Sequence, residues 1–227
     1  MKKHFPINKF FSFFLFLSVF VSPGASGGQF HQSPFGYPGF RPIAEFNVPG
    51  NLLISGNIQQ DLHSGVIKGL MYLREEEKLA RDVYSAFYSV FPLRPFENIS
   101  KSEQAHMTAI RRMIDLYGLT DPVKNNNPGE FSDPGLQQIY HSLIEQGVQN
   151  KISALKTAAF IKEKDIQDLQ FELDNHVLPQ NITYVYQNLL RASKRHLRVF
   201  TKILKGNGVE YIPQILEPDI YQIILAN

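Results

Sequence analysis

Glutamate and histidine stand three residues apart at Glu103 and His106, in a stretch with the apolar spacing of a helix. Residues at i and i+3 point to the same side of a helix, so both side chains should lie in line with Ile110 on the inward face. A Glu-x-x-His pair on the inward face of a bundle is what a carboxylate-bridged dimetal site requires. The carboxylate can bridge two cations while the imidazole binds one of them. The pair is therefore a candidate part of a metal site.

Glu103 also has a purely structural interpretation. Residues 100–103 (SKSE) fit a capping box, in which Glu103 would only tie the start of a helix that begins at Ser100. If the helix begins at Asn98, Glu103 falls one turn deeper and is free to bind metal. The sequence leaves both alternatives open.

A run of three glutamates lies in the preceding helical stretch. Glu77 stands between Leu73 and Ala80 on the buried stripe. Glu75 is expected to face solvent, and Glu76 lies at the border between the two faces. Glu77 is therefore the metal candidate of this stretch, although a run of charges is more often a solvated face.

The last two long helical stretches add a carboxylate and an imidazole. Glu163 stands between Ala159 and Ile166, whereas Asp165 lies roughly 200° away at 100° per residue, so Glu163 is the expected ligand and Asp165 the alternative. His196 lies on the core face of its helix, where a lone histidine is more often a hydrogen-bonded core residue. An isolated buried carboxylate costs several kcal/mol, so burial demands a partner or a cation.

Together these residues predict one site inside a bundle. Its expected metal ligands are Glu77, Glu103, His106, Glu163 and His196. The chain has no cysteine, so thiolate ligands and disulfides are excluded. Carboxylates with imidazoles suit iron best, as one or two ions, with manganese or zinc as alternatives.

The elements that must position these residues are helices. Apolar residues recur at three- and four-residue spacing over residues 62–91, from 98 or 100 to 117, 136–146, 152–175 and 182–205. The four long stretches form two pairs with short turns, joined by one connection of about 30 residues that holds the short helix. That connectivity predicts an all-α, ferritin-like four-helix bundle with one long crossover. A short extended piece at 209–212 and a short helix after Pro213 are expected at the end.

The N-terminal residues predict export. Lys2 and Lys3 precede an apolar run over residues 10–21, and the small residues of 23–27 (PGASG) follow, which is a signal-peptide pattern. The run is shorter than the roughly 20 residues of a membrane-spanning helix. We expect a signal peptide over 1–28, a flexible or extended arm rich in Gly, Pro and aromatics over 29–57, and the bundle domain over 58–227. The mature protein should be periplasmic or secreted, with an uncleaved anchor as the alternative.

The charge limits the partners of the chain. A formal net charge of +2, with both signs interspersed, argues against nucleic acid and against an anionic membrane surface. After cleavage of the signal peptide no membrane association is expected. Metal ions are the expected partners, and a homodimer is a possible assembly.

Four further motifs are REEEKLARDVY (residues 74–84), SEQAHM (102–107), DIQDL (165–169) and NLLRAS (188–193), the last running on to His196. In these motifs the chain resembles the DUF2202 family of ferritin-like proteins. The resemblance covers residues 69–211. It implies a ferritin-like fold with a site inside the bundle, and no established reaction.

A wider similarity to rubrerythrin-like diiron proteins suggests individual ligands. Their first-helix Glu stands three residues before an Ala-Arg pair, which selects Glu77, and their second-helix Glu-x-x-His matches Glu103 and His106. Two positions depart from the pattern. Ser193 stands where the fourth helix of that family has a second Glu-x-x-His glutamate, and 162–163 (KE) replaces a pair of acids that is frequent in relatives. The site should then hold two metals weakly or only one.

Two functions follow as expectations. The first is an exported metalloprotein with iron-linked redox activity, such as a ferroxidase, a peroxide scavenger or an oxidase. The second is a non-catalytic helical module for interaction or structure, with a degenerate metal site. The sequence leaves open whether the protein is an enzyme.

Overall fold

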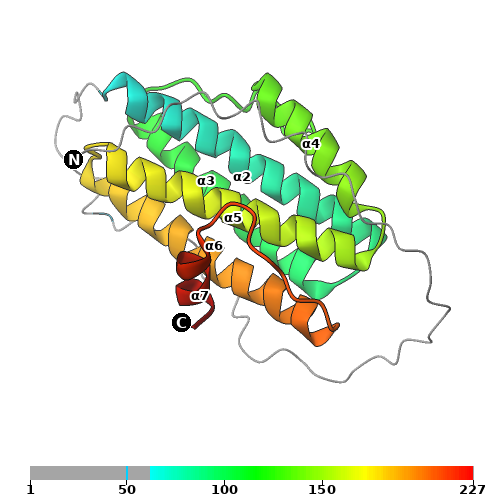
Figure 1. Ribbon diagram of the computed structural model, residues 1–227. Coiled ribbons are helices and arrows are strands. Elements are labelled where there is room, and N and C mark those ends of the chain that lie inside the picture. The colour runs from blue at the N-terminus through cyan, green and yellow to red at the C-terminus, as the bar shows by residue number, and fades with distance from the viewer. Residues whose placement is uncertain (1–49, 51–61, 227) are drawn as a thin grey trace. The chain divides into compact units, whose positions relative to one another are not determined.

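The computed structural model describes residue 50 and residues 62–226. The predicted signal peptide (1–28) and all but one residue of the predicted arm (29–57) lie outside the described residues. Throughout the described part the regular elements are helices, so the expected all-α class is confirmed (Figure 1). In this part no helix is both long enough and apolar enough to cross a membrane.

Four long helices form the bundle, with one shorter helix between the second and third of them and another at the C-terminus. They are α2 (Ser64–Val90), α3 (Arg94–Leu116), α4 (Pro134–Gly147), α5 (Lys151–Asn175), α6 (Gln180–Gly206) and α7 (Pro218–Ala226). The helix α2 packs along α3, and α5 packs along α6. The crossover connection carries α4 against α2 and α5, as Figure 1 shows. The stretch 209–212, expected to be extended, forms no strand.

Local chemistry explains several helix ends. Asp133 caps α4 by accepting hydrogen bonds from the backbone N–H groups of Gly135 and Leu136. Asn150 caps α5 in the same way through the N–H of Ser153. Just after α3, Gly118 has φ of 63°, a left-handed conformation that glycine adopts without steric cost.

The start of α3 corrects a prediction. The helix begins at Arg94, with Pro95 in its first turn, rather than at Asn98 or Ser100. A proline is tolerated there because the N–H that it lacks would have no partner within the helix. Glu103 therefore lies more than two turns inside α3, and the capping-box interpretation of this glutamate is wrong.

An aromatic cluster joins the long helices at the core. The rings of Tyr84 and Phe200 lie 5.5 Å apart between centroids, those of Phe87 and Phe96 5.6 Å, and those of Phe96 and Phe200 5.8 Å. The Tyr84 hydroxyl donates a hydrogen bond to the carbonyl of Ala158 at 3.3 Å, so α5 is tied to the same cluster. This packing fixes the relative depth of the helices, and with it the depth of the polar residues beside it.

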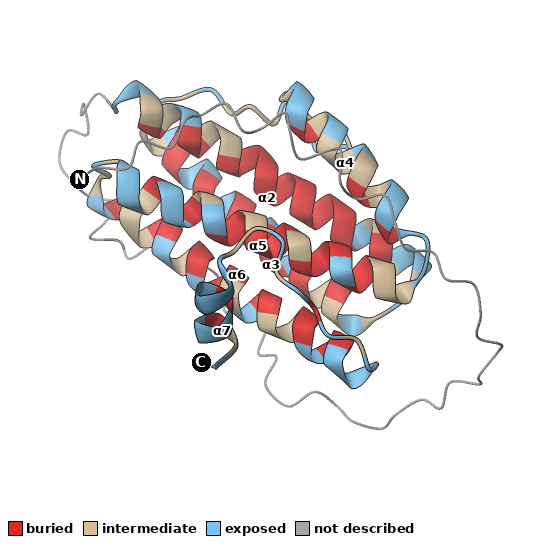
Figure 2. Cartoon of the chain, in the orientation of Figure 1, coloured by how far each residue is buried: buried red, intermediate tan, exposed pale blue. Residues whose placement is uncertain are grey.

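The helix α2 is enclosed along its middle. Every residue from Leu73 to Tyr84 is buried, as Figure 2 shows by the continuous red of its central turns. Glu75, expected to face solvent, is buried and accepts hydrogen bonds from the backbone N–H groups of Ser132 and Asp133 at 2.5 and 3.0 Å. The prediction for Glu75 was wrong because the crossover segment covers the face of α2 that would otherwise meet water.

Candidate metal centre

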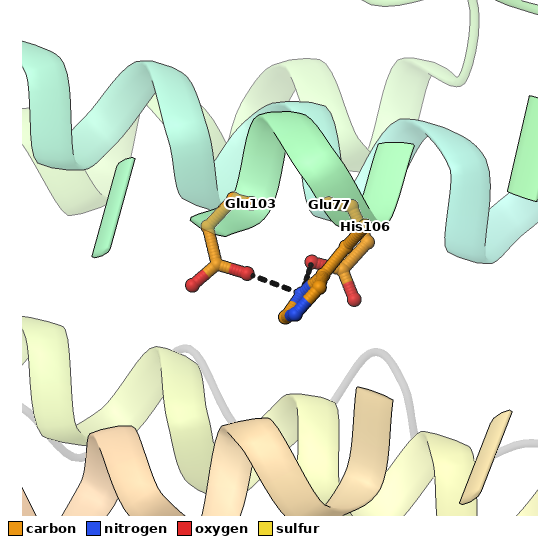
Figure 3. Close-up of side chains that lie close together, drawn as sticks. All are labelled: Glu77, Glu103 and His106. Carbon is orange, nitrogen blue, oxygen red and sulfur yellow. Dashed lines mark hydrogen bonds and ion pairs between the residues drawn. The ribbon is translucent and has the colours of Figure 1, made fainter. Parts of the chain in front are cut away.

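Three of the expected ligands meet between the two helix pairs. Glu77 comes from α2, and Glu103 and His106 come from neighbouring turns of α3. One ligand atom of each lies within 4.8 Å of the others, and all three residues are buried. In Figure 3 the three side chains point from α2 and α3 toward α5 and α6.

The imidazole of His106 lies between the two carboxylates. Its Nδ1 is 3.1 Å from Glu77 Oε2 and 2.8 Å from Glu103 Oε2 (Figure 3). The other ring nitrogen, Nε2, lies 3.3 Å from the hydroxyl of Ser102. This arrangement brings two oxygens and one nitrogen to a common point, as a metal ion requires.

His196 joins the group from α6. Its Nδ1 lies 3.2 Å from Glu103 Oε1, and its ring stacks at 22° to that of His106 with centroids 6.1 Å apart. The side chain is only 3% exposed. Four of the five expected ligands therefore lie together.

Glu163 does not join them. Its carboxylate is fully buried but accepts hydrogen bonds from the segment that follows α6. The donors are the Tyr211 hydroxyl at 2.5 Å and the backbone N–H groups of Gln214, Ile215 and Leu216, each within 3.1 Å. The choice of Glu163 as a ligand is corrected: this carboxylate already has four donors and holds the C-terminal segment on the bundle.

Lys162, which is not among the predicted ligands, and Asp165, the alternative to Glu163, extend the group at Glu103. The Lys162 ammonium is fully buried, lies 2.8 Å from Glu103 Oε1 and forms an ion pair with Asp165. Asp165, placed by angle on the far side of its helix, is thus the α5 carboxylate nearest to the site. A signal for Lys162 was available, because it falls four residues after Ala158 and four before Ile166 on a buried stripe.

Burial and neighbouring charges shift the pKa values of the three clustered residues. Burial raises the pKa of Glu77 to about 8, although His106 works against the shift. Burial alone would also raise the pKa of Glu103, but Lys162 and His106 outweigh it and hold that pKa well below its usual range. For His106 burial acts downward, yet Glu77 and Glu103 raise the pKa to about 10.

His196 and Lys162 face Glu103 from the other helix pair, and their pKa values are shifted in opposite directions. Burial lowers the pKa of His196 to about 4, so its imidazole is neutral at pH 7. Burial opposes the charge of Lys162, but Asp165 and Glu103 raise its pKa well above the ordinary value. The centre therefore holds an anionic Glu103 between cations, and a neutral imidazole with a lone pair for a ligand.

Relatives of the chain are found by sequence and by structure. It is similar to the uncharacterized protein MJ0754 of Methanocaldococcus jannaschii, with 38% identity over 174 residues, which are 77% of this chain and 94% of that protein. The crystal structure of hypothetical protein MJ0754 superposes with a TM-score of 0.73, covering 76% of this chain and 98% of the other. Residues 66–227 match the family described as uncharacterized protein domain DUF2202. Since this match spans all the helices of the bundle, the chain belongs to the DUF2202 family.

Proposed function

We propose that this protein is an exported, ferritin-like metalloprotein that binds a divalent metal ion, iron in the first place, with Glu77, Glu103 and His106. The observation that carries the proposal is that two carboxylates and an imidazole, all buried, have ligand atoms within 4.8 Å of one another. His196 adds a second imidazole on the far side of Glu103.

The donor set fits such an ion chemically. Oxygen and imidazole nitrogen are ligands that suit iron, manganese and zinc, whereas copper(I) prefers sulfur. The charges of Glu77 and Glu103 would be neutralised by one divalent ion, which removes the cost of keeping two carboxylates in an apolar interior. Binding would take the place of the proton that His106 otherwise holds between the two carboxylates.

The ferritin-like part of the proposal rests on connectivity and on ligand placement. Two helix pairs, α2 with α3 and α5 with α6, are joined by a crossover that carries α4. The metal-binding ferritin-like bundles place Glu and Glu-x-x-His ligands on their inward faces. Glu77, with Glu103 and His106, follows that plan on the first helix pair.

Iron-linked redox chemistry is the activity that we propose for the site. Iron held there would supply electron exchange with oxygen, peroxide or a second ferrous ion. The chain contributes a dry environment, since Glu103 and His106 are fully buried and Glu77 is 2% exposed. The proposed location, outside the cytoplasm, rests on residues 1–28 of the sequence alone.

One observation favours a second candidate, a non-catalytic helical module. The buried charges already have protein partners: His106 lies between Glu77 and Glu103, and Lys162 contacts Glu103 and Asp165. A network of this kind can specify one arrangement of helices without a metal. The two candidates differ in whether iron remains with the purified protein.

Metal content decides between them. The mature chain, produced in iron-supplemented medium and desalted, should carry a stoichiometric amount of iron by elemental analysis. His106→Ala should lose most of it, because a ligand is gone and the two carboxylates lose the group between them. His141→Ala is the matched control, since His141 is exposed on α4 and contacts Gln137 instead. Iron, manganese and zinc all at background level in the folded parent chain would favour the helical module.

A further inference from the structure

We propose that the Lys162 ammonium is a built-in second cation of this centre, so that the bundle binds one metal ion where a dimetal site would bind two. The inference rests on the proposed function, because it concerns how many ions the same site holds. It starts from the position of Lys162 at Glu103, and it makes Lys162 a residue that determines metal stoichiometry.

The two oxygens of Glu103 face two different half-sites. Oε2 lies 2.8 Å from His106 Nδ1, which in turn lies 3.1 Å from Glu77 Oε2. Oε1 lies 2.8 Å from Lys162 Nζ and 3.2 Å from His196 Nδ1. A bridging carboxylate in a dimetal site offers one oxygen to each ion. Here the Oε2 side is a set of metal ligands, and the Oε1 side meets an ammonium group.

Lys162 holds its half-site from within the bundle. The side chain is 0% exposed, its ammonium also pairs with Asp165, and it lies 5.3 Å from the centroid of the Tyr84 ring. A metal ion bound to Glu103 Oε1 would need a bond of about 2.0–2.2 Å, and it would be repelled by the Lys162 ammonium, which lies 2.8 Å from the same oxygen. Because the lysine is surrounded by protein, it has no solvent-facing position into which it could withdraw.

The charges lead to the same conclusion. The three carboxylates of Glu77, Glu103 and Asp165 are balanced by the Lys162 ammonium together with one divalent ion. A second divalent ion would leave an uncompensated double positive charge in a dry interior, which costs several kcal/mol per charge. The helix α6 supplies no further carboxylate here, since Ser193 stands one turn before His196 and is also buried.

Removing the ammonium should convert the half-site into a second metal site. Without Lys162 the position keeps Glu103 Oε1, His196 Nδ1 and the Asp165 carboxylate, two oxygens and one nitrogen. These are again donors that suit manganese, iron or zinc. The change in stoichiometry would be a gain, which a merely damaged protein does not produce.

The experiment counts Mn²⁺ per folded chain by equilibrium binding and records its electron paramagnetic resonance spectrum. The parent chain should bind one Mn²⁺ with the six-line spectrum of an isolated ion. Lys162→Ala should bind two, with the six lines lost to coupling between ions about 3.5–4 Å apart. Lys162→Gln removes the charge while keeping most of the volume, and it serves if the alanine variant does not fold. Lys164→Ala is the control, because this neighbouring lysine pairs with Glu76 and Asp168 instead, and it should still bind one ion.

The outcomes separate the two proposals. A parent chain that binds no Mn²⁺, Fe²⁺ or Zn²⁺ refutes the proposed function, and the role of Lys162 with it. A parent chain that binds two coupled ions refutes the role of Lys162 alone. A folded Lys162→Ala or Lys162→Gln that still binds one ion does the same. If neither variant folds, the parent stoichiometry decides, with one isolated ion in favour of the inference and two coupled ions against it.

Discussion

Buried glutamates in this bundle are stabilised in different ways. Glu103 lies among cations, and Glu163 accepts four sets of hydrogen bonds from the C-terminal segment. Glu172 has neither arrangement. A Cβ atom on Gly69 would lie 2.2 Å from Glu172 Oε2, so this carboxylate rests directly on the backbone of α2. The imidazole of His176 lies beside it, with Nε2 3.7 Å from Oε2.

Glu172 should make stability fall with rising pH. Burial, followed by the charge of Asp168, raises its pKa to about 7 from an ordinary 4.5. Since the folded pKa lies above the unfolded one, the contribution is fully present below pH 4.5 and is lost as the pH rises through 7. Glu172→Gln should therefore be more stable than the parent at pH 8 by about 1 kcal/mol, discounted from the full shift because the carboxylate is partly open to water.

Urea unfolding at pH 4.5 and pH 8 measures this effect. Near pH 4.5 the variant and the parent should agree within error, and the gap should open between pH 5 and 8. Glu145→Gln, at an exposed position of α4, is the control and should show no such divergence. A parallel pH dependence for Glu172→Gln and the parent would contradict the assignment.

The crossover segment covers the outer face of α2. Lys78 Nζ lies 2.7 Å from Asp82 Oδ2 and donates to the carbonyl of Asn127 at 2.7 Å, while Asp82 also accepts from the N–H of Gly129 and from Arg81. The Lys78 side chain is 0% exposed and Asp82 2%. These contacts fasten the connection between the helix pairs to the outer face of α2.

Two pairs with the same spacing test how much burial matters. Lys78→Ala should lower the free energy of unfolding by about 3 kcal/mol, because it leaves Asp82 buried with one cation fewer and leaves the Asn127 carbonyl without this donor. Lys101→Ala removes the other lysine of an i, i+4 pair, with Glu97, where the side chains are 71% and 35% exposed. Its cost should be under about 0.5 kcal/mol. Denaturant melts of both variants give the comparison, and equal losses would show that the buried network contributes little.

Local pattern predicted the elements well because it depends on neighbours in sequence. The expected helix at 152–175 is observed as Lys151–Asn175, and that at 182–205 as Gln180–Gly206. The start of α3 was missed because the helix begins before the expected Asn98 or Ser100, with Pro95 in its first turn. The pattern did predict the inward positions of Glu77, Glu103, His106 and His196. A polar residue on an apolar stripe is costly to bury unless it has a partner, so its presence there indicates a site.

The predictions that were wrong concern residues whose contacts are distant in sequence. An angle on a helical wheel assumes one buried face, but α5 packs against α6 on one side and against α2 and α4 on others. Asp165 is therefore buried despite its angle on the helical wheel. Glu75 is covered by Ser132 and Asp133, which are distant from it in sequence. The hydrogen-bond donors to Glu163 lie after α6, in a segment whose position in the fold the helical pattern does not predict.

At the scale of the whole molecule, metal and fold should depend on each other. The proposed ligands come from α2 and α3, and one of them, Glu103, also contacts Lys162 of α5 and His196 of α6, so the ion would bind where both helix pairs meet. Binding to the native state alone adds about 2.7 kcal/mol at a ligand concentration 100-fold above Kd. For a domain of this size that corresponds to about 5 to 10 °C in melting temperature.

A pair of thermal melts at pH 7 tests this dependence. The metal-loaded chain should melt higher than the same sample after prolonged dialysis against a chelator, and His106→Ala should melt at one temperature under both conditions. Superimposable curves for the parent chain would oppose a structural role for metal and favour the non-catalytic module.

The enclosure of α2 bears on how fast an ion could come and go. Glu77 lies within the stretch of α2 that is buried on every side, and Glu103 and His106 are fully covered between the helix pairs. An ion held there could leave only when neighbouring helices separate locally. Its residence time would therefore depend on the rate of this local opening more than on the strength of the metal–ligand bonds. A site of this kind suits long retention of its ion. It is poorly suited to rapid delivery of its ion to another protein.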